Sequence, residues 1–254
     1  MTCEPFMEID HDTWNYGRPK LRSAGKITLP DIHGVLPFSG VRNPITASNT
    51  SFKVSLTYRT EANGWQPRVG LVESGAELAV AEDVLTKPGI HDVEFQPVRF
   101  PYRHPSGRTA WHTIDMRITF RSGLRRFVFV RNRSSLQKPW VLDEIAAIAE
   151  AVPEQEAHDF VLVEGDTYSR PHRENLRRMH RLVAFEPDPV SDRLVEAAIL
   201  ELKTLWRMSD LARHIDLKPA RIFGSCLRLI AAKKLGANMD AVIDQHSRIW
   251  RIEE

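Results

Sequence analysis

The chain has 254 residues, enough to bury a substantial core as one large domain or two smaller ones. Its 42% hydrophobic and 27% charged residues are ordinary for a globular protein, and 35 basic against 33 acidic residues leave a net charge of only +2. Overall charge therefore does not predict a partner, and only the distribution of charge along the chain is informative.

Several classes of protein are disfavoured. No apolar run approaches the ~20 residues of a membrane span, and acids stand in the first residues where a signal peptide has a basic and then an apolar segment. We therefore expect a cytoplasmic protein with no membrane partner. The distant Cys3 and Cys226 predict neither a disulfide framework nor a zinc site. There is no glycine-rich phosphate loop and no Gly-x-Ser-x-Gly motif, which argues against nucleotide hydrolysis and serine-type catalysis.

Residues 1–68 are rich in Pro, Gly, Asn, Ser and Thr, which is typical of an extended arm with short strands, here expected at residues 27–29 and 51–58. Such an arm could cover a sheet, or it could lie along nucleic acid or a protein partner. The basic residues that would make such contacts are Arg18, Lys20, Arg22, Lys26 and Arg42.

Residues 71–138 contain the most informative pattern, one helix followed by three strands. Ser74 is a suitable N-cap, and Glu77 lies three residues later, where its carboxylate can reach back to the free amides of the first turn. Pro88 and Gly89 end this helix.

Of the strands that follow this helix, two show clear alternation. In the first, Ile114, Met116, Ile118 and Phe120 share a face and Asp115 lies on the other; in the second, Phe127, Phe129 and Arg131 oppose Val128 and Val130. This arrangement brings Glu77, Asp115, Phe129 and Arg131 near one point, as in the core of a metal-dependent nuclease.

Four short motifs in this stretch resemble the TnsA-like endonucleases, restriction-endonuclease-fold subunits that cut one strand at transposon ends. The resemblance spans roughly residues 40–185. The motifs are Ser74-x-x-Glu77, Gln96-Pro97, Thr113-Ile114-Asp115 and the run from Phe129 to Leu136. The resemblance implies that Glu77 and Asp115 occupy the acidic metal-site positions of that family.

The third strand departs from the family pattern, which has Glu or Gln, then any residue, then Lys. This chain has Phe129 and Arg131 at those positions. A phenyl ring offers Mg²⁺ no oxygen ligand, and an arginine is always protonated and cannot act as a base, although it can bind phosphate. We therefore expect a remnant site at Glu77 and Asp115 with weak metal binding or none, and no cofactor.

An active nuclease remains an alternative, and only in that case would Mg²⁺ be a cofactor. Four acids could gather the metal, and a different cation could replace the missing Lys. The acids are Glu73, Glu77, Glu94 and Asp115, and the candidate cations are Lys138 and Arg117.

After this stretch, a helix is expected at residues 141–151, a parallel strand at 160–163 and a basic helix at 174–183. Six basic residues and no acid occur between residues 121 and 138, and the last of these helices carries further arginines. We therefore predict that the phosphate backbone of double-stranded DNA is contacted by Arg131, Arg133, Arg177 and Arg178.

Residues 188–254 predict a winged helix-turn-helix, with helices at 191–205, 209–215 and 219–235 followed by an alternating region at 243–252. In the third helix an apolar stripe leaves Arg221, Ser225 and Arg228 pointing outward. Such side chains contact phosphates and base edges. Helix-turn-helix units also dock proteins, so that alternative stays open.

Taken together, the sequence predicts an α/β (α+β) protein with an arm at residues 1–68, a restriction-endonuclease-like core with a mixed sheet at 69–187, and a winged helix-turn-helix at 188–254. The expected function is DNA binding by a pseudo-nuclease linked to a mobile element or another DNA transaction complex. The alternatives are an active magnesium-dependent endonuclease and a docking subunit with a transposase-like partner.

Overall fold

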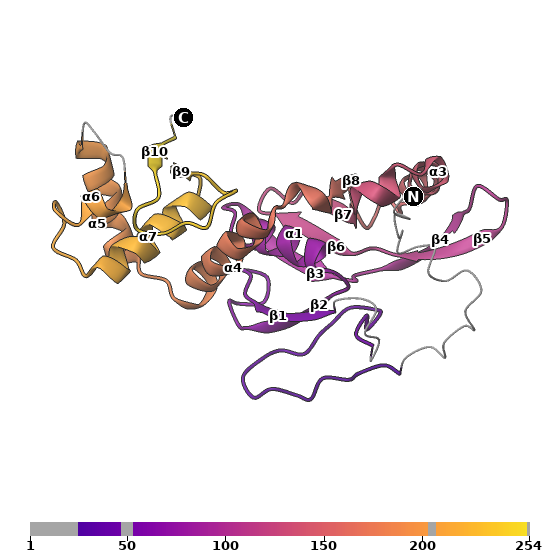
Figure 1. Cartoon of the computed structure of the whole chain (residues 1–254). Helices are drawn as coiled ribbons and strands as arrows, with labels where there is room; N and C mark the ends of the chain where they lie inside the picture. Colours follow the sequence, from indigo (N-terminus) through magenta and orange to yellow (C-terminus); the bar gives the residue numbers. More distant parts are fainter. Residues whose placement is uncertain (1–24, 47–52, 203–206, 253–254) are drawn as a thin grey trace, which may run out of the picture.

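The computed structural model describes residues 25–46, 53–202 and 207–252. They form a mixed α/β structure, as the sequence predicts, and its strands are divided among one four-stranded and several two-stranded sheets (Figure 1). The largest sheet has the strand order β3-β6-β7-β8. Its strands are β3 (Ile90–Phe95), β6 (Met116–Phe120), β7 (Arg125–Arg131) and β8 (Asp159–Glu164).

This sheet is mixed, because β3, β6 and β7 are antiparallel neighbours whereas β8 runs parallel to β7. In the register, Met116 faces Val128, and Val128 faces Val161. Helix α3 (Pro139–Glu150) carries the chain from β7 to β8, so the predicted helix and parallel strand are both present. The strand β8 is half-buried along its whole length.

Helix α1 (Gly75–Leu85) packs on one face of the sheet, where Leu78 and Ala81 meet Val93, Met116 and Val128. The predicted capping is confirmed. Ser74 Oγ accepts a hydrogen bond from the Glu77 amide at 3.1 Å, and the Glu77 carboxylate accepts one from the Glu73 amide at 2.8 Å. The first turn of α1 therefore holds the Glu77 carboxylate in place.

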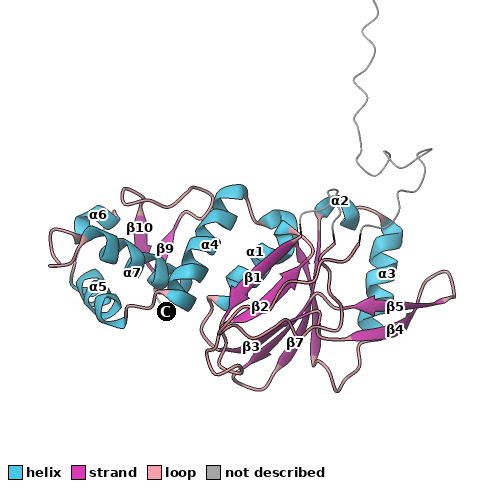
Figure 2. Ribbon diagram, turned by 90° about the horizontal axis from the view of Figure 1, so that it is seen from below, coloured by secondary structure: helices cyan, strands magenta, loops and turns pink. Residues whose placement is uncertain are grey.

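The other face of the sheet packs against α3 and against a two-stranded hairpin, β4 (Arg99–Arg103) and β5 (Thr109–Thr113), which Figure 2 shows beside that helix. The apolar cluster here contains Phe100, Phe127 and Ile148. Ile114 also belongs to this cluster, so the prediction that it shares a face with Met116 and Ile118 is wrong. The reason is that β5 ends before Ile114 and β6 begins after Asp115, so the alternation is interrupted there.

Five strands, not three, follow α1 before Lys138, because the hairpin β4–β5 was not predicted. Pro101 lies in the middle of β4, where it faces Trp111 of β5. A proline has no N–H to donate and usually signals a break, but a two-stranded ribbon has free edges that tolerate it.

The hairpin β1 (Val54–Tyr58) and β2 (Arg68–Val72) lies beside β3. Gly70 permits this close approach, because a Cβ at this position would stand 2.7 Å from the Phe95 ring.

The strand expected at residues 27–29 does not form. In this part of the described chain there are an isolated bridge between Lys26 and Thr46 and a hydrogen bond from the Ile27 amide to the Ile45 carbonyl. Of the basic residues predicted for the arm, Arg18, Lys20 and Arg22 lie outside the described residues.

The C-terminal part consists of helices and a short antiparallel hairpin, in the predicted order (Figure 1). The third helix of the prediction ends at Ala231 rather than at residue 235, and the second ends at Leu211 rather than at residue 215. The expected end of the first, Leu205, lies outside the described residues. Helix α4 (Arg170–Phe185) precedes this part, whose elements are α5 (Pro189–Glu201), α6 (Met208–Leu211), α7 (Pro219–Ala231), β9 (Leu235–Ala237) and β10 (Ile249–Arg251).

Helix α4 connects the two parts of the molecule, and Figures 1 and 2 show it between the sheet and the helices α5–α7. Met179 of α4 packs with Val195, Leu211 and Cys226 in the C-terminal core. Packing therefore crosses the boundary predicted after residue 187. In the described part of the chain, every helix is too short or too polar to cross a lipid bilayer.

Candidate functional site

A pocket of about 330 Å³ opens where the β4–β5 hairpin meets the sheet and the start of α1. Four of its lining residues are cationic or can become so, namely Arg42, Arg99, His112 and Arg131. The others are Glu73, Trp111, Thr113 and Asp115. Of the four residues predicted to lie near one point, Asp115 and Arg131 line the pocket. The other two, Glu77 and Phe129, lie directly behind it.

Glu77 and Asp115, the two predicted acids, are brought together at the back of this pocket. Both are buried, and Asp115 is only 5% exposed. The Glu77 carboxylate accepts hydrogen bonds from the Glu73 amide and from the Ser74 hydroxyl, at 2.8 and 2.9 Å. The Asp115 carboxylate accepts one from the Val130 amide at 3.0 Å. Backbone and hydroxyl donors therefore orient both groups.

Each of these acids is held in an environment that disfavours its charge. Burial raises the pKa of Glu77. Burial, followed by repulsion from Glu77, raises the pKa of Asp115 to about 7. Since repulsion of this kind needs a short separation, the two carboxyl groups act on each other directly.

Phe129 and Arg131 of β7 complete the group, as the alternation along that strand predicts. The Phe129 ring is 1% exposed and meets the edge of His112 at a centroid distance of 4.8 Å. The guanidinium of Arg131 lies 3.8 Å above the Phe129 ring and donates to the Val130 carbonyl at 3.0 Å. Its charge lowers the pKa of Glu77 and Asp115, but burial outweighs it at both.

These residues do not fit a closed magnesium site. Mg²⁺ takes six oxygen ligands in near-octahedral geometry, whereas Phe129 offers none and a guanidinium lies beside the acids. Within the described ranges, no three His, Cys, Asp or Glu side chains gather in a way that could hold a metal ion.

The wider set of acids considered for an active nuclease does not assemble either. Glu94 forms two hydrogen bonds with Arg117, at 2.6 and 2.8 Å, and Arg117 also bonds to Glu156. Glu94 and Arg117 therefore neutralise each other across β3 and β6, and neither lines the pocket. Lys138 is the residue before α3. Glu73 does line the pocket, where it pairs with Arg42 at 2.8 Å.

Two further residues near the acids were not predicted as part of this site, Arg42, which lines the pocket, and Gln96, which contacts it. Arg42 donates to the Gln96 side chain at 3.0 Å as well as pairing with Glu73. Gln96 is fully buried in a left-handed conformation with φ 51°, and its backbone N–H donates to the Asp115 backbone carbonyl at 3.0 Å. The Gln96-Pro97 motif was the available signal for this position.

The hairpin β4–β5 supplies the rest of the pocket. Arg99 lies over the Trp111 ring, 5.4 Å from its centroid, and Trp111 is 59% exposed. Burial lowers the pKa of His112 to about 4, so this ring is neutral at neutral pH. No sequence signal indicated these residues, because the hairpin itself was missed.

The predicted DNA contacts of the core fall into two classes. Arg133 and Arg177 are largely exposed, and they form surface ion pairs with Glu164 at 2.6 Å and with Glu174 at 3.7 Å. Arg178 is half-buried instead. Its guanidinium donates to the Ile243 carbonyl at 2.7 Å and lies over Phe223 at 5.0 Å. The expectation that Arg178 is a free surface residue is wrong, because α4 packs against the C-terminal unit.

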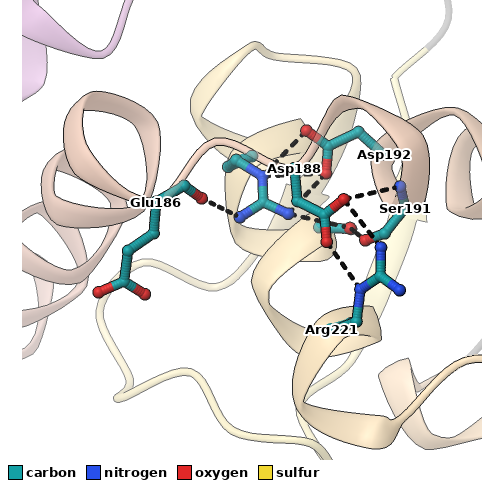
Figure 3. A network of polar contacts seen from close by, with 7 residues as sticks. Glu186, Asp188, Ser191, Asp192 and Arg221 are labelled. Carbon is teal, nitrogen blue, oxygen red and sulfur yellow. Dashed lines mark hydrogen bonds and ion pairs between the residues drawn. The ribbon is translucent and has the colours of Figure 1, made fainter.

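The predicted contacts on α7 are also tied into the fold, as Figure 3 shows around Asp188 and Asp192. Arg221 makes a two-pronged ion pair with Asp188, at 2.8 and 2.9 Å, and lowers the pKa of that acid. Arg228 is only 10% exposed at its side chain and bonds to Asp192 at 2.7 Å.

Ser225 is fully buried and shares a 2.6 Å hydrogen bond with Ser191. The prediction that Ser225 and Arg228 point outward is therefore wrong. The physical reason is that α7 is packed between α4 and α5, and Asp192 of α5 accepts the hydrogen bonds of Arg228. Arg221, at the start of the helix, is the exposed member of the three.

Compared with models of known protein families the chain matches none, and a comparison with curated proteins likewise finds no match.

Proposed function

We propose that this protein binds DNA through a TnsA-like, restriction-endonuclease-like core whose metal-dependent centre no longer cuts. The single observation that carries the proposal is the replacement at β7. Glu77 and Asp115 stand together, but Phe129 and Arg131 occupy the positions of an oxygen ligand and an amine. A metal-dependent nuclease needs an activated water, and Phe129 and Arg131 supply neither the third oxygen ligand nor the neutral amine that would help to generate one.

The same replacement is compatible with holding a phosphodiester. A guanidinium binds phosphate oxygens in two-pronged geometry and keeps its charge at every physiological pH. Arg131 and Arg42 border the pocket, and Arg133 and Arg177 are exposed outside it. In this proposal the core makes the DNA contacts, and the C-terminal unit, proposed as a winged helix-turn-helix, does not read bases with α7.

Two measurements test the proposal. The purified protein should shift a duplex in a gel with an affinity that falls steeply as salt rises, because each phosphate contact releases about one counterion. It should leave supercoiled plasmid intact in Mg²⁺ or Mn²⁺. Nicking by the unmodified protein that disappears in Asp115→Ala would overturn the inactive-centre proposal and favour the active endonuclease.

A protein-docking role for the C-terminal unit is a second candidate, favoured by an exposed apolar pair on α5. Val190 and Leu194 lie one turn apart and are 54% and 47% exposed. This apolar pair suits a transposase-like protein partner better than DNA, because neither Val190 nor Leu194 offers a cation to a phosphate. If an integrase-like gene adjoins this one, its product should co-purify with this protein and be lost on Leu194→Asp. Retention by that variant would contradict the docking role.

A further inference from the structure

The pocket at the β4–β5 hairpin has three arginines that reach it from three separate segments. Arg42 comes from the segment before β1, Arg99 from β4 and Arg131 from β7. Convergence of this kind is uncommon for surface arginines, because three like charges repel unless something neutralises them. The acids in the pocket do not neutralise all three arginines.

The acids in the pocket account for only part of this positive charge. Glu73 pairs with Arg42 at 2.8 Å. Arg99 has no carboxylate partner among the described residues and instead lies over Trp111. Asp115 faces the pocket, and its carboxylate accepts a hydrogen bond from the Val130 amide at 3.0 Å. The pocket therefore favours an anionic ligand.

The second feature is an aromatic ring at the edge of the pocket. Trp111 is 59% exposed although it is the largest apolar side chain of the hairpin. An exposed tryptophan beside arginines is the arrangement on which nucleic-acid bases stack, with the phosphate held by the cations. Thr113, two residues further along β5, adds a hydroxyl to the same lining.

From these features we infer that the pocket binds one unpaired nucleotide, with its phosphate on Arg42, Arg99 and Arg131 and its base on Trp111, without a divalent cation. A volume of about 330 Å³ is near the lower end of ligand pockets and suits one nucleotide rather than a base pair. A base inside a duplex is stacked on its neighbours and cannot stack on Trp111 unless it leaves the helix.

This inference rests on the proposed function for its choice of a nucleic-acid ligand, and it names the ligand of that same site. Two sources could supply the nucleotide, a free mononucleotide or the unpaired end of a DNA strand. Their shared chemistry is a phosphate next to a stacked base, and separate arms of one experiment distinguish them.

The first arm is calorimetry of the full chain with thymidine 5′-monophosphate in buffer containing EDTA. We expect binding that thymidine and inorganic phosphate each reproduce only weakly. Trp111→Ala should weaken it about fivefold to a hundredfold, the range that base stacking on an aromatic ring provides. Arg99→Ala should weaken it as well, and neither substitution disturbs the buried core, since both side chains are exposed.

Matched controls are available on the same elements. Arg103 is exposed on β4, four residues after Arg99, and is not part of the pocket. Trp140 of α3 is 65% exposed and also lies outside the pocket. Arg103→Ala and Trp140→Ala should leave the affinity unchanged. Equal losses in the control variants, or binding that requires Mg²⁺, would overturn the inference.

The second arm compares a blunt DNA hairpin with the same hairpin carrying a short 5′-phosphorylated overhang. We expect tighter binding of the overhang, and Trp111→Ala should abolish the difference. If the blunt hairpin binds and neither the overhang nor the mononucleotide gains from Trp111, the pocket inference fails while the proposed DNA binding stands. If the mononucleotide binds and no hairpin does, the pocket inference stands and the proposed function fails.

Discussion

The molecule contains two clusters of arginine and acid that have the same residue types and differ in their electrostatics. In the core pocket, burial raises the pKa of Glu77 and Asp115, so ionisation of these acids opposes folding. Between α5 and α7, Arg221 lowers the pKa of Asp188, and Arg228 is bonded to Asp192 at 2.7 Å. The second cluster is neutralised internally, and the first is not.

The cluster between α5 and α7 therefore stabilises the fold, whereas the charged forms of the acids in the core pocket destabilise it. Groups whose pKa is strongly perturbed by burial and by a like charge, in a pocket, are typical of functional sites. Arginines whose donors are already used by acids of the same chain have little left to offer a ligand. Four tests of this contrast follow, and their effects on the free energy of unfolding are expected to differ in size and in sign.

The largest effect is expected for Phe129→Glu combined with Arg131→Lys. The Phe129 ring is 1% exposed and touches His112, so a carboxylate at this position would be buried beside two other acids. We expect the free energy of unfolding to fall by about 4 kcal/mol or more without metal. Part of this loss should be recovered in Mn²⁺, since the third oxygen ligand is then present.

Urea denaturation with and without Mn²⁺ measures both effects. Adding Asp115→Ala to the double variant serves as the control and should remove the recovery. If Mn²⁺ stabilises the unmodified protein as much as the variant, then Phe129 and Arg131 do not block metal binding and the contrast between the clusters is lost.

A smaller loss is expected for Arg228→Ala, which removes one partner of a mostly buried ion pair. Asp192 would lose its partner, and Ser225 would lose the bond that it receives at 3.1 Å. We expect the free energy of unfolding to fall by about 3 kcal/mol. Arg221→Ala, at the exposed end of the same helix, should cost clearly less. Equal effects of the two substitutions in thermal and urea unfolding would show that burial does not distinguish them.

The opposite sign is expected for Asp115→Asn. The pKa of Asp115 is about 7 in the folded protein against an ordinary 3.8, so its ionisation destabilises the fold increasingly as pH rises from about 4 to 7. An asparagine oxygen can still accept from the Val130 amide. We expect Asp115→Asn to raise the free energy of unfolding by about 2 kcal/mol at pH 8, with the gain vanishing below about pH 4.

Unfolding curves at several pH values measure this difference against the unmodified chain. Asp143→Asn, which changes an exposed carboxyl on α3, is the control and should show no such pH dependence. Destabilisation by Asp115→Asn at pH 8 would mean that the charged form is well compensated, and the core cluster would then resemble the cluster between α5 and α7.

Local patterns predicted much of this fold. The capping of α1 by Ser74 and Glu77, the α3–β8 return and the order of the C-terminal helices all depend on neighbours within a few residues. The hairpin β4–β5 was missed because Pro101 and a polar composition hide its alternation. Because the hairpin was not predicted, Arg99 and Trp111 were not predicted as site residues, and half of the pocket lining was missed.

The direction in which arginines point was harder to predict than the helices that carry them. Helical spacing separates an apolar stripe from the rest of a helix, and the remainder is then assumed to face solvent. Arg228 breaks this assumption because Asp192, its partner, lies 36 residues earlier in the chain. A contact between distant segments leaves no periodic signal, so Ser225 and Arg228 were placed on the wrong side. Phe129 and Arg131 were placed correctly because strand alternation is strictly local.

The smallest effects are expected for two neighbouring arginines of α4, which allow the contrast to be tested within one helix. Arg178→Ala removes a bond to the Ile243 carbonyl and a contact with Phe223, so we expect a loss of about 1 kcal/mol in the free energy of unfolding. Arg177 is 55% exposed, and its ion pairs are long, at 3.7 and 3.9 Å. Arg177→Ala should therefore change stability by less than about 0.5 kcal/mol.

DNA affinity should follow the reverse order, because only the exposed arginine has donors available to a phosphate. A salt series with a duplex should show weaker binding and a shallower slope for Arg177→Ala, by about one counterion, and no change of slope for Arg178→Ala. The two substitutions must be made separately, since a double variant would combine a stability loss with a binding loss. If Arg178→Ala lowers the slope while stability is unchanged, its bond to the Ile243 carbonyl opens in the complex, and internal pairing does not remove an arginine from the binding surface.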